Sequence, residues 1–433
     1  MGILIYIFVF FIEVTIAIGS IFAKSNLMKV RNPVRIGTFV LFVILTLTSV
    51  IEWSFRYYAL AFLLFLMAVI GAVNLIRHKE ERKSYNASRT VWKAIGMIEL
   101  LFVLTLPAII FPQYRAIEST GKFQVATANY TYTDVNRIET YATTGENRKI
   151  NVGFWYPEKG EGTYPLVIFS HGSFGVKSSN LSLYTDLVSH GYVVVSIDHT
   201  YQCFFTTDEN GHTTWMDMGY MQEISAADAH TNKKQALEYF QKWMDIRMGD
   251  IDFVINRIIA ETKNNNADRV YTLVDTEKIG VMGHSLGGSA ALGIGRMRED
   301  ISAVVALESP FMYDIEGVIN REFVFLDEEY PVPVLNVYSD SSWSHLAEWA
   351  QYAENYALLS NTNADAFNIY INGVTHLGLT DFALTSPILT LMIDGRRSMT
   401  PTVEALMTIN KISLEFFDKY LKGEGEFTFA GVR

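Results

Sequence analysis

The sequence predicts an α/β fold with a doubly wound, mainly parallel sheet, preceded by a four-helix transmembrane region. Four long apolar runs occupy the first 115 residues, and most reach the roughly 20 residues that a helix needs to cross a bilayer. Beyond them, short apolar runs rich in Val and Ile alternate with helical patterns, as expected of strands covered on both faces. We therefore expect two domains, residues 1–115 and residues 116–433.

Charge and composition support the same division. Residues 1–115 carry 12 Lys and Arg against 5 Glu, whereas the remainder carries 23 basic and 41 acidic residues. The whole chain is 49% hydrophobic and only 19% charged, which is too apolar for an ordinary soluble enzyme. The single cysteine, Cys203, excludes a disulfide-rich fold, and the acidic second part argues against nucleic acid as a partner.

Loop charges predict the orientation of the first domain. The apolar runs cover residues 2–22, 36–51, 57–76 and 94–114. Basic residues gather after the first and third runs, whereas the connection between the second and third runs holds only Arg56. The ten basic residues are Lys24, Lys29, Arg31, Arg35, Arg77, Lys79, Arg82, Lys83, Arg89 and Lys93. Because basic loops stay on the cytoplasmic side, we expect a multi-pass protein of the cell membrane whose N-terminus and second domain lie outside the cytoplasm.

Two ionisable residues interrupt the apolar runs, Glu13 and Glu99. Ionisable groups inside a membrane are functional candidates, but a buried hydrogen bond between helices is the simpler interpretation. The sequence contains no repeat, partner cation or broken helix that would favour transport. We therefore expect these helices to serve as an anchor.

Seven strands are expected in the second domain. They cover residues 149–156, 165–170, 192–197, 278–282, 302–307, 333–338 and 367–371. The segment 200–264 is long for a connection, with a polar start and a helical end. We expect it to form either a cap over a site or an elaborated crossover.

The motif Gly-His-Ser-Leu-Gly-Gly at residues 283–288 directly follows one expected strand and precedes an apolar helical segment. A serine on a sharp strand-to-helix turn needs neighbouring glycines, because side chains there would collide with the strand or the helix. The turn raises the hydroxyl of Ser285 above the sheet and places the amide of Leu286 at a helix N-terminus, where a developing oxyanion is stabilised. Ser285 is therefore the candidate nucleophile and Leu286 a candidate oxyanion donor.

A serine hydroxyl needs a base, and the fold that carries this turn orders its groups as Ser, acid and His along the chain. Only His345 and His376 follow Ser285. His345 lies in a pattern typical of an amphipathic helix, where a histidine is usually a surface residue. His376 follows the last expected strand in a loop, so it is the candidate base.

The acid and the second oxyanion donor come from other strand ends. Glu308 and Asp340 both end strands between the serine and the histidine, and spacing does not decide between them. The loop His-Gly-Ser-Phe-Gly after strand 165–170 can turn a backbone amide inward, which makes the amide of Ser173 the candidate partner of Leu286. His171 precedes the nucleophile, so we expect it to brace this loop.

An ordered set of segments resembles the platelet-activating-factor acetylhydrolase family of secreted α/β-hydrolases over roughly residues 127–422. The segments are FSHGSFG, SIDHTY, IGVMGHSLGGSAAL, ALESPFMY, VTHLGLTDF and INKISLEFFDKYLKG. The resemblance implies an α/β-hydrolase fold and a triad of Ser285, Glu308 and His376. It also implies that Ser173 and Leu286 occupy the two oxyanion-hole positions.

The chain departs from the family pattern in two ways. The family acid is Asp, whereas the matching residue is Glu308, which keeps Asp340 open as the alternative acid. The four-helix membrane region is not part of the pattern, so the substrate can differ. The family needs no metal, and the sequence has no H-E-x-x-H or comparable ligand cluster, so we expect no cofactor.

We expect a membrane-anchored serine esterase that cleaves carboxylic esters through an acyl-enzyme. The resemblance suggests short or oxidised acyl groups of phospholipids, so the expected partners are a lipid or small ester and the membrane itself. The alternatives are a general carboxylesterase, an acyltransferase, or a catalytically idle hydrolase-fold domain that serves as a sensor on the membrane bundle.

Overall fold

The computed structural model describes residues 2–77, 85–359, 366–429 and 431–432. The chain divides into two compact units. One comprises Met1–Arg115 with Thr385–Leu389, and the other comprises Ala116–Leu384 with Thr390–Arg433.

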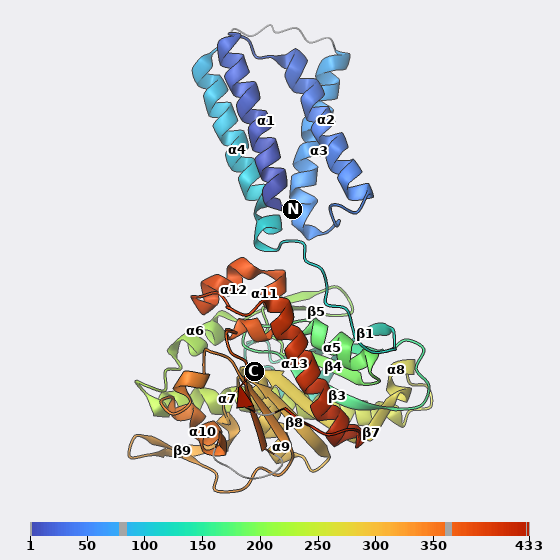
Figure 1. Cartoon of the computed structure of the whole chain (residues 1–433), viewed down its shortest axis with the longest axis vertical. Coiled ribbons are helices and arrows are strands. Elements are labelled where there is room, and N and C mark those ends of the chain that lie inside the picture. The colour runs from blue at the N-terminus through green and yellow to red at the C-terminus, as the bar shows by residue number, and fades with distance from the viewer. Residues whose placement is uncertain (1, 78–84, 360–365, 430, 433) are drawn as a thin grey trace. The chain divides into compact units, whose positions relative to one another are not determined.

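The first unit contains four helices that run side by side (Figure 1). They are α1 (Gly2–Phe22), α2 (Met28–Leu47), α3 (Phe55–Ile76) and α4 (Ala87–Ile110). All four are long and apolar enough to cross a membrane, which confirms the predicted four apolar helices. Their outer faces expose many large apolar side chains, such as Phe11, Phe62 and Trp92, as expected of helices surrounded by lipid.

Helix α2 begins earlier than its apolar run predicts. Lys29, Arg31 and Arg35 lie in its first turns and not in a loop. Lys and Arg are good helix formers, and their long side chains can carry the charge away from the apolar surface. The helix can therefore begin before the apolar run begins. Of the other basic residues used to predict the orientation, Lys79, Arg82 and Lys83 lie outside the described residues.

Glu13 has the partner cation that its own sequence neighbourhood does not contain. It is 4% exposed, and its Oε1 lies 3.6 Å from Nη2 of Arg35 on α2. The expectation of no partner cation is therefore wrong, because the partner comes from another helix. Glu99 is exposed on α4 and forms no hydrogen bond or ion pair with the residues that the structure describes.

The second unit is built on a nine-stranded sheet in the order β1-β2-β4-β3-β7-β8-β11-β12-β13. The strands are β1 (Val125–Ile138), β2 (Asn147–Pro157), β3 (Tyr164–Ser170), β4 (Val193–Asp198), β7 (Val274–His284), β8 (Ile301–Leu307), β11 (Val334–Tyr338), β12 (Ala366–Tyr370) and β13 (Gly431–Val432). The pairs β1-β2 and β2-β4 are antiparallel and the other pairs are parallel, which confirms the mainly parallel sheet.

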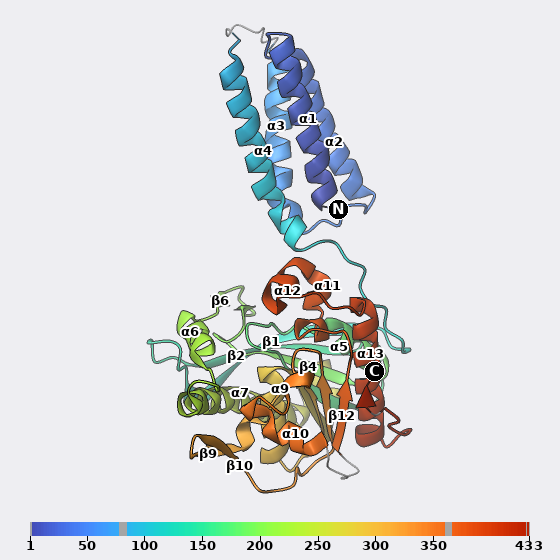
Figure 2. The same cartoon turned by 60° about the vertical axis from the view of Figure 1, so that its left-hand side comes forward.

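Helices cover both faces of this sheet (Figure 2). Helices α7 (Lys233–Thr262) and α9 (Leu286–Met297) pack in one apolar cluster, and α5 (Leu181–Ser189) and α13 (Thr402–Phe417) pack in the other. Every residue of β4 is buried as a result, which agrees with the mostly apolar sequence VVVSID of this strand. The remaining α-helices are α6 (Met218–Ala226), α8 (Arg269–Thr272), α10 (Ala353–Leu359), α11 (Phe382–Thr385) and α12 (Pro387–Asp394).

Two segments depart from simple sequence patterns. Residues 200–264 form the hairpin β5 (Phe205–Thr207) and β6 (Thr213–Trp215), then α6 and α7, and α7 belongs to the core. A second hairpin joins β9 (Ile315–Ile319) and β10 (Glu322–Phe325).

The expected amphipathic helix around His345 is wrong, because short 3-10 turns precede α10 there. They let Trp343 stack on Tyr370 of β12, with ring centroids 4.9 Å apart, a contact that outweighs the local helical preference.

Candidate active site

Ser285 lies on a strained turn between β7 and α9. Its φ of 54° and ψ of −127° are rare for any residue with a side chain. Its amide donates a hydrogen bond of 2.8 Å to the carbonyl oxygen of Leu307 at the end of β8. The next residue, Leu286, begins α9, so the hydroxyl of Ser285 stands at the N-terminus of that helix.

The glycines around Ser285 are required by close backbone approach. A Cβ on Gly283 would collide with the backbone of Gly287, and a Cβ on Gly287 would collide with the carbonyl oxygen of Ser170. The strand, the turn and the helix can therefore pack this closely only with the G-x-S-x-G spacing.

Glu308 follows β8, the strand next to the one that carries Ser285. It is 2% exposed, and its φ of 54° is also strained. Its Oε2 accepts a hydrogen bond of 2.9 Å from the amide of Ser339, while its Oε1 lies 3.9 Å from Nδ1 of His376. Oε1 has no hydrogen-bond partner among the described residues, so one carboxylate oxygen remains available to the imidazole.

His376 lies in the loop after β12, with 32% of its side chain exposed. Its amide donates a hydrogen bond of 3.0 Å to Oγ of Ser341. Burial alone would lower the pKa of His376, but the interaction with Glu308 and the negative charge of Asp394 outweigh it and raise this pKa above 6.5. The ring is therefore in an environment that stabilises its protonated form.

The alternative acid, Asp340, holds the backbone of the histidine loop. Its Oδ1 accepts hydrogen bonds of 2.8 Å from the amide of Gly373 and from the hydroxyl of Tyr370. Its other oxygen lies 3.9 Å from Nη2 of Arg396. The structure thus brings Glu308, and not Asp340, to the ring of His376.

His345 lies apart from this group. Its Nδ1 is 2.9 Å from a carboxylate oxygen of Glu348, its ring stacks on Trp349, and 42% of its side chain is exposed.

The two candidate oxyanion donors have free amides. Neither the amide of Leu286 nor that of Ser173 donates a hydrogen bond to another described residue. A Cβ on Gly172 would lie 3.2 Å from Cβ of Ser285, so the loop after β3 rests against the nucleophile. The hydroxyl of Tyr220 on α6 donates a hydrogen bond of 3.1 Å to Oγ of Ser173. Two backbone N–H groups beside a serine can stabilise the oxyanion of acyl transfer.

Sequence reasoning assigned no role to His284, which is buried beside the nucleophile. Its Nε2 donates a hydrogen bond of 3.1 Å to the carbonyl oxygen of His376, and the two rings lie 4.5 Å apart between centroids. Burial, followed by the neighbouring His376, lowers the pKa of His284 well below 6.5, so it stays neutral. The one sequence signal for such a role was the position of His284 directly before Ser285 in the motif Gly-His-Ser-Leu-Gly-Gly.

One group of side chains in the described part of the chain has spacing that could hold a metal ion: His171, Asp198 and Cys203. Two of its three residues already use possible ligand atoms in hydrogen bonds. Asp198 accepts hydrogen bonds from the hydroxyl of Thr206 and the amide of Lys177, and Nδ1 of His171 donates to the carbonyl oxygen of Gly172. Burial raises the pKa of the Cys203 thiol, which opposes thiolate formation. These residues therefore fit a hydrogen-bonded core better than a metal site.

The chain spans less than two thirds of the length of several curated relatives that it matches. The platelet-activating factor acetylhydrolase of Canis lupus familiaris is 24% identical over 60% of this chain and 57% of its own length. That of Cavia porcellus is 24% identical over 60% and 58%. Cutinase 1 of Thermobifida cellulosilytica is 24% identical over 44% and 52%.

Solved structures include a similar fold. The ferulic acid esterase of Streptomyces cinnamoneus superposes with a TM-score of 0.53 at 18% identity, covering 71% of this chain and 93% of the esterase. This likeness confirms the predicted α/β-hydrolase fold.

A family model described as platelet-activating factor acetylhydrolase, isoform II, matches residues 135–429, which is more than half of the chain. Curated relatives of the chain are named acetylhydrolases, cutinases and an esterase, which agrees with the predicted class of ester hydrolase. The chain belongs to the platelet-activating factor acetylhydrolase, isoform II, family.

Proposed function

We propose that this protein is a membrane-anchored serine esterase whose hydrolase unit faces away from the cytoplasm. The observation that carries the proposal is that three groups follow the carboxyl ends of parallel strands in one sheet. Ser285 follows β7, buried Glu308 follows β8, and His376 follows β12 with Nδ1 3.9 Å from that carboxylate. Ligands of open α/β sheets bind at this edge.

In the proposed reaction, Oγ of Ser285 attacks the ester carbonyl while Nε2 of His376 takes the hydroxyl proton. The carbonyl oxygen becomes an oxyanion between the amides of Leu286 and Ser173, and Glu308 stabilises the imidazolium. Collapse breaks the bond to the leaving alcohol, which receives the proton from His376. Water then attacks the acyl-enzyme by the same route and releases the carboxylic acid.

The serine hydroxyl and the acid–base pair are not joined by hydrogen bonds of ordinary length in the structure. Oγ of Ser285 forms no hydrogen bond with any described residue, and the Glu308–His376 separation exceeds hydrogen-bond length. Catalytic hydrogen bonds are often long in unliganded enzymes and tighten when substrate binds. The exposed third of the His376 side chain leaves its ring accessible for such an adjustment.

Short or oxidised acyl groups of phospholipids are the substrates that we propose. The named acetylhydrolases among the relatives support this class, as does a relative from Arthroderma benhamiae named probable 1-alkyl-2-acetylglycerophosphocholine esterase. Four helices able to cross a membrane belong to the same chain, which raises the local concentration of lipid substrates.

A general carboxylesterase is the second candidate, favoured by the cutinase relative and by the fold shared with the ferulic acid esterase. An acyltransferase would use the same acyl-enzyme, with an alcohol replacing water. An idle sensing domain would retain the fold without turnover.

The test uses the full chain in membranes. Fluorophosphonate should label wild-type protein and leave Ser285→Ala unlabelled, and absence of wild-type labelling would support the idle domain. Rates per labelled site are then compared for phospholipid vesicles that carry acetyl or palmitoyl at the same position, and for soluble nitrophenyl esters. Faster release of acetyl supports the proposed substrate. Turnover of the soluble esters alone would support a general carboxylesterase, and ester products formed with added alcohol would support a transferase.

A further inference from the structure

A fully buried arginine lies behind the loop that carries Ser173. Arg247 projects from α7 with no exposed surface. Its Nε donates a hydrogen bond of 2.7 Å to Oε1 of Gln202, and its Nη1 donates to the carbonyl oxygen of His171. Its Nη2 has no hydrogen-bond partner among the described residues, and no carboxylate there lies within ion-pair distance. Burying a cation without a direct counter-ion destabilises the folded protein, so the position of Arg247 needs a functional explanation.

The contacts of Arg247 hold both ends of the candidate oxyanion loop. His171 begins this loop, and the next residue, Gly172, rests against Ser285. Gln202, the other partner of Arg247, accepts a hydrogen bond of 3.2 Å at its carbonyl oxygen from the amide of Phe174. Ser173 therefore lies between two points that the guanidinium fixes.

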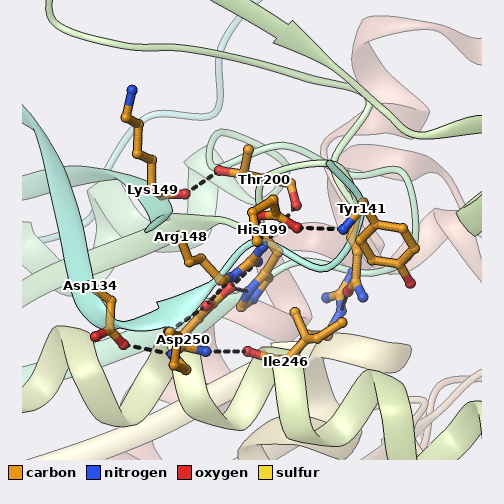
Figure 3. Close-up of polar contacts among 12 residues, drawn as sticks. Asp134, Tyr141, Arg148, Lys149, His199, Thr200, Ile246 and Asp250 are labelled. Atoms are coloured by element: carbon orange, nitrogen blue, oxygen red, sulfur yellow. Dashed lines mark hydrogen bonds and ion pairs between the residues drawn. The ribbon is translucent and has the colours of Figure 1, made fainter. Parts of the chain in front are cut away.

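A neighbouring network of ion pairs carries one excess negative charge. Asp250, which lies one turn along α7 from Arg247, accepts hydrogen bonds from Arg148 and His199. Figure 3 shows these two side chains converging on Asp250 above the helix. The members of this network are Asp134, Arg137, Glu139, Arg148 and Asp250. They comprise three carboxylates and two guanidinium groups, so the formal charge of Arg247 balances the excess without pairing with any one of them.

Arg247 and the network together are formally neutral. Arg247, which carries the balancing positive charge, is the member that contacts the oxyanion loop. His171 and His199, which lie between Arg247 and the network, add no charge at neutral pH. Burial, with a contribution from Arg247, lowers the pKa of His199 to about 4 and that of His171 well below 6.5. A fixed charge in a dry interior acts over longer distances than in water, because little solvent screens it.

We infer that Arg247 is a positioning residue of the oxyanion hole: bound to His171 and lacking a counter-ion, it orients the loop of Ser173 and stabilises the negative charge that develops on the carbonyl oxygen of the substrate. The inference rests on the proposed function. Preorganised charge behind an oxyanion lowers the barrier because it needs no reorganisation during the reaction.

Gln202→Glu provides a nearly isosteric test. The glutamate keeps the acceptor for Nε of Arg247 and adds the missing counter-ion, so the melting temperature should stay the same or rise. The paired arginine should support the oxyanion less, so kcat for a nitrophenyl ester should fall about tenfold with KM unchanged. Affinity for an alkyl boronic acid, which forms a tetrahedral adduct on serine, should fall by a similar factor. Gln241→Glu, an exposed change of the same charge on α7, is the matched control and should leave kcat unchanged.

A second pair of variants separates charge from hydrogen bonding. Arg247→Lys keeps the charge and Arg247→Gln loses it, so the lysine variant should retain the higher kcat per labelled site. If Gln202→Glu does not fold, the ranking of kcat in the two Arg247 variants tests the inference instead. Wild-type kcat in folded Gln202→Glu, or equal kcat in the two Arg247 variants, would overturn the inference. Absence of wild-type turnover and labelling would instead refute the proposed function.

Discussion

Ser285 and Leu307 are joined by a hydrogen bond of 2.8 Å from amide to carbonyl oxygen, which ties the nucleophile turn to the strand end that carries the candidate acid. The residues on the two turns, Ser285 and Glu308, share a φ of 54°. Such backbone strain persists only where surrounding structure imposes it, and it concentrates at functional sites.

Ser285→Gly should be more stable than Ser285→Ala by about 1 kcal/mol, because glycine adopts a positive φ without a Cβ clash. Both variants lose the hydroxyl, so neither should label with fluorophosphonate or turn over ester. Thermal unfolding of the full chain in detergent measures the difference. Equal melting temperatures would mean that the turn stores no strain.

Glu308→Gln should lower kcat by roughly 10³ to 10⁴ with little change in KM, by analogy with loss of the orienting carboxylate of a triad. Asp340→Asn should have a much smaller effect on kcat, because Asp340 binds the backbone of Gly373 and not the imidazole. Steady-state kinetics per labelled site gives both values. The opposite ranking would assign the acid to Asp340.

Asp394→Asn should shift the acidic limb of activity to lower pH while preserving the plateau. Activity is lost as pH falls through the pKa of His376, because a protonated ring cannot accept the serine proton. The charge of Asp394 helps to raise that pKa above 6.5, so its removal lowers the pKa and leaves the neutral ring available at lower pH. A pH–kcat profile measures the shift, and an unmoved limb would exclude His376 as the titrating base.

Glu13→Ala should destabilise the helical bundle by about 3 to 5 kcal/mol, because it leaves Arg35 without its partner inside the unit. The double variant Glu13→Gln with Arg35→Gln should recover most of that loss, since no unpaired charge remains. Unfolding of the full chain in mixed detergent micelles compares the three proteins. Equal stability of the single and double variants would show that the pair contributes nothing.

A cysteine placed at Glu158 should react in intact cells with a reagent that cannot cross the membrane, whereas one placed at Asn86 should not. The expectation follows from the basic residues concentrated after the first and third apolar runs. The native Cys203 is buried and should contribute little background. The reverse labelling pattern would place the hydrolase unit in the cytoplasm.

Local sequence was enough to predict seven strands of the large sheet, because strands covered on both faces are mostly apolar. It missed β1, an antiparallel edge strand whose pattern NYTYTDVNRI mixes polar and apolar residues. It also predicted a helix around His345, where the stacking of Trp343 on Tyr370 favours separate short turns.

Glycine spacing and apolar periodicity are local properties of the chain, so they were sufficient to predict the order of seven sheet strands and the turn around Ser285. The folded chain was needed to show that Glu308 approaches His376, that Arg35 pairs with Glu13, and that Arg247 contacts the loop of Ser173. Those relationships join residues far apart in the chain. They depend on strand order and on the direction of each side chain, and neither is encoded in local spacing.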